Sequence, residues 1–194
     1  MHAPALILAS TSPHRRLLLE RLGLPFEAVA PGVDETRSPR EPVEQLVRRL
    51  SRAKAEAVAA AYPDALVIGS DQAAESEGEI LGKPGDHLAA VAQLKAASGK
   101  YMKFHTGLCV IDTRDGRIQE YTDVTRVAFR RLTDVEIERY LQVEKPYDSA
   151  GSFKSEGLGI TLFDAMESND PSALIGLPLI ALCRFLRAAG VELP

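Results

Sequence analysis

The sequence lacks tryptophan entirely, and aromatic residues make up only 6% of its 194 residues. It has two cysteines, Cys109 and Cys183, which lie far apart in the chain. Two isolated cysteines form neither a disulfide framework nor a CxxC zinc motif. Because both lie in apolar segments, we expect each of them to be a small buried side chain.

Long apolar runs and an excess of positive charge are also absent. No run reaches the roughly 18 apolar residues that a membrane span needs. The apolar run at 5–9 is too short for a signal peptide, so we expect a cytoplasmic protein that does not bind membranes. The chain has 23 Lys and Arg against 27 Asp and Glu, a net charge of −4. This balance argues against a surface for nucleic acid polymers, although a few cations in one cleft can bind a small anion.

Hydrophobic residues make up 45% of the chain, enough for a sizeable core. Their spacing predicts one α/β domain over 1–194, with a mixed sheet. We expect helices over 13–23, 43–61, 86–97, 133–143 and 178–189. We expect strands over 6–9, 26–30, 65–69, 101–112, 117–130 and 161–166. Asp115-Gly116 is typical of a hairpin turn.

The segment 10–16, directly after the first predicted strand, carries hydroxyls and arginines. Ser10, Ser12 and the backbone N–H groups of a helix N-terminus can bind an anion, and Arg15 adds charge. A capped helix with solvated arginines explains the same residues equally well.

Four more polar features lie at predicted strand ends, in loops or on the second helix: Asp34-Glu35, Lys54, Asp71 and Gly82-Lys83-Pro84. Each has an ordinary alternative, such as a solvated surface lysine for Lys54 or a turn cap for Asp71. Together they indicate one chemistry, in which cations neutralise phosphates while acids hold a divalent metal and orient water. Asp71 at an ordinary pKa of about 3.9 is a weak base, and a metal that lowers the pKa of bound water would compensate. The set therefore predicts hydrolysis of a phosphoryl or nucleotidyl bond.

The sequence resembles the Maf family of nucleoside triphosphate pyrophosphatases over nearly its whole length. The segments that carry this resemblance are 6–16, 33–35, 68–72, 82–84, 150–157 and 176–178. The resemblance implies a two-lobed Maf/ITPase-like α/β fold, with a mixed central sheet flanked by helices and a cleft between the lobes. It also implies a homodimer, a divalent cation (Mg or Mn) and attack of water at the α-phosphorus, which yields a nucleoside monophosphate and pyrophosphate.

Residue roles follow from the resemblance position by position. Asp71 would be the catalytic proton acceptor, and Glu35 would hold the metal together with it. Ser10, Ser12, Arg15, Lys54 and Lys83 would bind phosphate. Three positions, His14, Gln72 and Glu156, match those that set base preference.

Within the family, the chain looks most like the subgroup that hydrolyses 7-methyl-GTP, because Gln72 follows Asp71 and Glu156 lies in the 155–157 loop. A carboxylate such as Glu156 can accept both the N1–H and the N2–H₂ donors of guanine. Position 14 is often Trp in this subgroup but is His14 here. A neutral imidazole can stack on the cationic base, whereas a protonated one would repel it. A dTTP/UTP-type pyrophosphatase and a septum regulator that binds nucleotides without turnover are the alternatives.

Overall fold

The structure is a computed structural model that describes residues 4–194. The chain divides into two compact units. Of the described residues, unit 1 contains 4–72, 106–123 and 170–194, and unit 2 contains 73–105 and 124–169.

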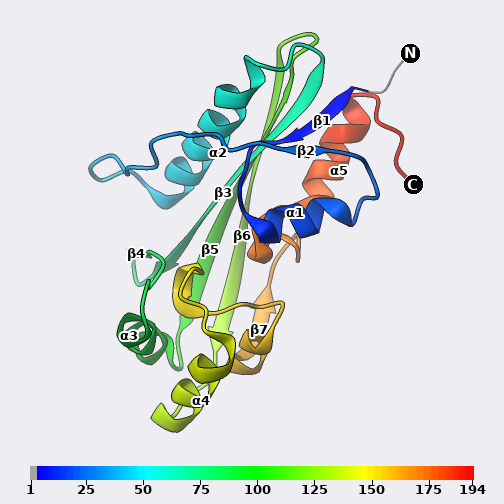
Figure 1. Ribbon diagram of the computed structural model, residues 1–194. Coiled ribbons are helices and arrows are strands. Elements are labelled where there is room, and N and C mark those ends of the chain that lie inside the picture. The colour runs from blue at the N-terminus through cyan, green and yellow to red at the C-terminus, as the bar shows by residue number, and fades with distance from the viewer. Residues whose placement is uncertain (1–3) are drawn as a thin grey trace. The chain divides into compact units, whose positions relative to one another are not determined.

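The fold is a mixed α/β fold, as the sequence predicted (Figure 1). The strands are β1 (Ala5–Leu8), β2 (Glu27–Ala28), β3 (Ala65–Ser76), β4 (Glu79–Leu81), β5 (Tyr101–Asp112), β6 (Arg117–Phe129) and β7 (Phe163–Glu167). The helices are α1 (Pro13–Glu20), α2 (Val43–Ala59), α3 (His87–Ala97), α4 (Asp134–Glu144) and α5 (Leu179–Ala188), with short 3₁₀ turns η1 (Ala150–Ser152), η2 (Leu158–Leu162) and η3 (Ala173–Ile175). The strand order is β2-β1-β3-β5-β6-β7, with β4 paired to β3. β1 is parallel to β2 and β3, whereas β4 and β7 pair antiparallel to their neighbours.

In unit 1, helices cover both faces of β1 (Figure 1). Successive side chains of a strand point to opposite faces. Leu6 and Leu8 therefore pack in the cluster with α1 and α5, while Ile7 packs with α2. α2 lies very close to the sheet, because a Cβ added at Gly69 would come 2.1 Å from the carbonyl oxygen of Ser51. This close approach brings the side chains of α2 to the middle of β3.

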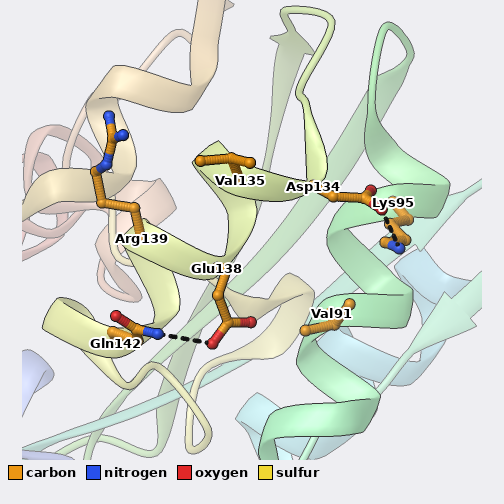
Figure 2. A pocket seen from close by; sticks show the side chains of 7 residues that line it. All are labelled: Val91, Lys95, Asp134, Val135, Glu138, Arg139 and Gln142. Carbon is orange, nitrogen blue, oxygen red and sulfur yellow. Dashed lines mark hydrogen bonds and ion pairs between the residues drawn. The ribbon is translucent and has the colours of Figure 1, made fainter.

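The core of unit 2 is aromatic. Phe153 packs edge-on against Phe104, Phe129 and Phe163, with ring centroids 5.1, 5.4 and 4.9 Å apart. α3 and α4 lie side by side in this unit, and Figure 2 shows the open pocket that they line. Two polar pairs lie in this pocket: Lys95 forms an ion pair with Asp134, and the Gln142 amide donates to Glu138.

Several sequence predictions are confirmed. All five helices form, and β5 and β6 are hydrogen-bonded neighbours joined at the expected turn. Both cysteines are free thiols, and Cys109 is buried as expected, whereas Cys183 is only half-buried. Among residues 4–194, no helix is long and apolar enough to span a membrane.

Some strand predictions were wrong. The strand expected to end at residue 69 continues to Ser76, so Asp71 lies inside β3 rather than after it. The polar residues 70–72 suggested a turn, but tertiary hydrogen bonds satisfy their side chains within the strand. β4 was missed, and the strand expected from residue 161 starts at Phe163, after η2.

Candidate active site

Lys54 links two acidic residues in unit 1. Its Nζ lies 2.6 Å from Asp71 Oδ1 and 2.7 Å from Glu35 Oε1. Lys54 is 5% exposed, which excludes the alternative of a solvated surface lysine. Asp71 is also buried, and its other carboxylate oxygen has no hydrogen-bond partner among the described residues. One buried ammonium therefore joins three elements of unit 1: α2, β3 and the loop before α2.

Burial raises the pKa of Asp71 above its ordinary value. The positive charges of Lys54 and Arg15 oppose this rise, and the negative charge of Glu35 adds to it. A carboxylate with a raised pKa is a stronger base than an ordinary aspartate. Asp71 thus combines a carboxylate oxygen without a partner among the described residues with a raised pKa.

The loop that carries Glu35 is fixed by its own hydrogen bonds. The Asp34 carboxylate accepts bonds from the N–H and hydroxyl of Thr36, which lower its pKa. Arg49 of α2 forms a bidentate pair with Glu41 at 2.7 and 2.9 Å and also donates to the Thr36 carbonyl oxygen. Arg49 therefore ties the loop that carries Glu35 to α2 at two points, Thr36 and Glu41.

Ser10, Ser12 and Arg15 lie together at the N-terminus of α1. Ser12 is the N-cap residue, and its hydroxyl accepts from Arg15 N–H at 3.4 Å. The hydroxyl of Ser10 accepts from the Ser12 N–H at 3.1 Å and from Arg15 Nη1 at 3.4 Å. Arg15 Nε donates to the Gly176 carbonyl oxygen at 2.9 Å. Burial lowers the pKa of Arg15, although an arginine stays charged in proteins, so a desolvated cation stands at this helix terminus.

Gln72 has a fixed amide orientation. Its Nε2 donates to Thr106 Oγ1 and to the carbonyl oxygens of Ala173 and Leu174, at 2.8 to 3.0 Å. The opposite orientation would place Oε1 against three oxygens. Gln72 consequently presents an acceptor, which suits a partner with N–H donors such as guanine.

The structure brings together only part of the predicted set. Asp71, Glu35 and Lys54 are in contact, and Arg15 interacts electrostatically with Asp71 and Glu35. His14 is half-buried in the first turn of α1 in the same unit. Lys83 and Glu156 belong to unit 2, where both are exposed residues of loops.

Three residues of unit 1 were not singled out from the sequence as site residues, although two of them contact one and the third, Ser70, contacts Gly176. Ser70 and Gly176 meet beside Arg15, and Thr106 holds Gln72. The period of two along a strand could have indicated Ser70, because it shares a strand face with Gln72.

The carboxylates suit a divalent cation shared with a substrate better than a site built from protein alone. Among residues 4–194, no group of three or more His, Cys, Asp and Glu side chains is placed to hold a metal. Mg²⁺ is commonly held by one or two carboxylates together with substrate phosphates and water. Asp71 and Glu35, which share Lys54, supply two such carboxylates.

Comparisons with known proteins agree with this chemistry. A family model described as "Maf-like protein" matches residues 5–189. A protein named 7-methyl-GTP pyrophosphatase from Burkholderia pseudomallei is 57% identical over 193 residues, covering 98% of this chain and 90% of that protein. Proteins of the same name from Ralstonia nicotianae and Aromatoleum aromaticum are 56% and 54% identical. The alignments cover 95% of this chain and 95% of the Ralstonia protein, and the whole of both chains for the Aromatoleum protein.

A solved structure shares the fold. The Ham1 protein of Staphylococcus aureus superposes with a TM-score of 0.53 at 14% identity, over 95% of this chain and 99% of that one. This likeness supports the mixed α/β fold and the predicted ITPase-like architecture. With a family model that matches residues 5–189 and relatives more than 50% identical over nearly the whole chain, this chain belongs to the Maf family.

Proposed function

We propose that this chain hydrolyses 7-methyl-GTP to 7-methyl-GMP and pyrophosphate. The observation that carries the proposal is the Lys54 ammonium between Asp71 and Glu35, beside Arg15, in a chain more than half identical to proteins named 7-methyl-GTP pyrophosphatase. The reaction fits the general chemistry of this cluster, which pairs a basic carboxylate with cations that can hold phosphates.

In the proposed reaction, Asp71 accepts a proton from water, and the water oxygen attacks the α-phosphorus. The bond from the α-phosphorus to the bridging oxygen breaks, and that oxygen leaves with pyrophosphate. Lys54 already holds one oxygen of Asp71, so the other oxygen is the one open to the attacking water or to the divalent cation that activates it. General base catalysis by one positioned side chain typically contributes 10²- to 10⁴-fold.

The charges of the cluster support a role for further cations in the proposed reaction. Arg15 and Lys54 carry two positive charges, and Asp71 and Glu35 carry two negative charges, so this part of unit 1 is neutral. A triphosphate therefore needs further positive charge. We propose that Lys83 supplies one cation and that Asp71 and Glu35 hold a divalent cation, Mg²⁺ or Mn²⁺. When bound, this ion would offset phosphate charge.

Base selection is proposed for three residues. The Glu156 carboxylate can accept from both the N1–H and the N2–H₂ of guanine, donors that pyrimidines do not offer as a pair. The Oε1 atom of Gln72 is a separate acceptor for a base donor. Stacking by His14 in its neutral form would favour the methylated base. A homodimer and a cytoplasmic location remain part of the proposal, and light scattering of the purified protein tests the dimer.

A substrate panel tests the proposal. Pyrophosphate release is measured for 7-methyl-GTP, GTP, dTTP, UTP and CTP with Mg²⁺ or Mn²⁺. The highest kcat/KM is expected for 7-methyl-GTP. A higher value for dTTP or UTP would support the other subgroup, and tight binding without release would support a nucleotide-binding regulator. Either result rejects the proposed substrate or the proposed turnover.

A further inference from the structure

Alternate residues of β3 in unit 1 serve two different neighbours. Gly69 and Asp71 face α2, as the contacts with Ser51 and Lys54 show. Ser70 and Gln72 face the loop of residues 170–178, called the 170–178 loop below. The hydroxyl of Ser70 is completely buried and lies 2.9 Å from the Gly176 carbonyl oxygen and 2.7 Å from that of Gly107.

The Gly176 carbonyl oxygen also accepts from Arg15 Nε at 2.9 Å. One backbone oxygen therefore connects the buried Ser70 hydroxyl with the cation at the start of α1. Gly176 has φ of +127°, a conformation that side-chain-bearing residues rarely adopt. A glycine is thus required where the chain turns this carbonyl toward both donors.

The rest of the 170–178 loop is held independently of Ser70. Thr106 Oγ1 and Gln72 Nε2 donate to the Ala173 carbonyl oxygen at 2.9 and 2.8 Å. Asp170 accepts from the Ile180 N–H at the start of α5 and from the Ser172 hydroxyl. Loss of the Ser70 hydroxyl would leave these bonds in place, so its effect should be confined to the two carbonyl oxygens that it contacts, those of Gly176 and Gly107.

We propose that Ser70 is a positioning residue that orients Arg15 for a polyphosphate ligand through the carbonyl oxygen of Gly176. The inference rests on the proposed role of Arg15 in binding phosphate. Arg15 has five N–H donors, of which one is on Gly176 and one is on Ser10. The other three have no hydrogen-bond partner in residues 4–194 and match the oxygens of a phosphate. Fixing Nε sets the plane of the guanidinium, and with it the direction of those three donors.

Inorganic tripolyphosphate is the probe, because it carries charge but no base or scissile nucleotide bond. Calorimetry measures the Kd of tripolyphosphate for the wild-type protein, for Ser70→Ala and for Ser51→Ala. Ser51 is a matched control, since it is equally buried and its hydroxyl donates to the Arg48 carbonyl oxygen within α2. We expect Ser70→Ala to raise Kd by roughly three- to tenfold, the range typical of the loss of one neutral hydrogen bond. Ser51→Ala should change Kd less than about twofold.

A double-mutant cycle separates positioning from a general structural effect. Arg15→Lys keeps the charge and measurable binding but loses the planar fork. In that background, Ser70→Ala should change Kd by less than about twofold. An equal effect of Ser70→Ala in both backgrounds, or no effect in either, would overturn the proposal. Ser70→Cys, which keeps the volume but donates weakly, should shift Kd in the same direction if the alanine variant folds poorly.

The outcomes also separate this inference from the proposed function. Coupling of Ser70 and Arg15 on tripolyphosphate without 7-methyl-GTP hydrolysis would reject the function and keep the positioning role. Hydrolysis of 7-methyl-GTP without coupling would reject the positioning role alone.

Discussion

Unit 1 and unit 2 hold their candidate functional residues in different ways. In unit 1, Lys54 and Asp71 are buried and joined by an ion pair of 2.6 Å. In unit 2, Lys83 and Glu156 are exposed on loops, above a core of packed phenylalanines. Side chains fixed by burial and hydrogen bonds suit a chemical step, which needs precise geometry, whereas exposed ones can adapt to a ligand. We therefore expect variants in unit 1 to change kcat and variants in unit 2 to change KM.

The largest effect is expected for Asp71→Asn, which removes the proposed base but keeps the size and a hydrogen-bond acceptor. The kcat for 7-methyl-GTP should fall by roughly 10³-fold, measured as pyrophosphate release. Asp112→Asn is the matched control, because Asp112 is a buried, ion-paired aspartate of unit 1 away from this cluster. If Asp71→Asn keeps more than about a tenth of the wild-type kcat, Asp71 is not the base, and the chemical step does not depend on this cluster of unit 1.

Lys54→Met should have the next largest effect. It leaves Asp71 and Glu35 without the ammonium that links them. We expect kcat to fall on the order of 10²-fold and the free energy of unfolding to fall by roughly 3 kcal/mol, as for other broken buried pairs.

Lys95→Met is the control for Lys54→Met, because Lys95 forms an exposed ion pair with Asp134 in unit 2. It should lower the free energy of unfolding by less than about 1 kcal/mol. If the two variants lose the same free energy of unfolding, the buried ion pair of unit 1 contributes no more to stability than the exposed ion pair of unit 2.

Lys83→Met tests the other side of the comparison. Lys83 is exposed and forms no ion pair or hydrogen bond with the residues that the structure describes. The free energy of unfolding in urea should therefore be the same as for the wild type. Loss of one cation that binds phosphate should raise KM on the order of tenfold with little change in kcat. Lys100→Met, which removes another exposed lysine of unit 2, should leave KM unchanged. A fall in kcat with unchanged KM would place Lys83 in the chemical step.

Local sequence patterns predicted the helices well, because apolar periodicity reports burial directly. They failed around Asp71, where a polar run suggested the end of a strand. Those side chains stay in β3 because partners distant in sequence satisfy them, such as Lys54 for Asp71 and Gly176 for Ser70. A local sequence pattern does not reveal such distant partners. The residue types indicated a shared phosphate chemistry, and the family resemblance assigned each residue its role.

The smallest expected effect concerns the loop that carries Glu35. Bonds from Arg49 lower the pKa of Glu41 from 4.5 to about 2. A carboxyl group with a lowered pKa stabilises the fold fully above its unfolded pKa near 4.5, and this contribution is lost as the pH falls toward 2. Glu41→Gln should therefore lower the free energy of unfolding by about 1 kcal/mol at pH 7, as an ion pair of this kind does.

The pH dependence is the sharper test of that loop. The difference in unfolding free energy between the wild type and Glu41→Gln should stay constant above about pH 5 and shrink below it, measured by urea unfolding from pH 7 to pH 3. Glu56→Gln is the control, because Glu56 pairs with Arg52 on the exposed face of the same helix. If the difference in unfolding free energy between the wild type and Glu41→Gln does not shrink at low pH, the ion pair of Glu41 with Arg49 does not hold the loop. Glu35 would then be placed as loosely as the exposed residues of unit 2.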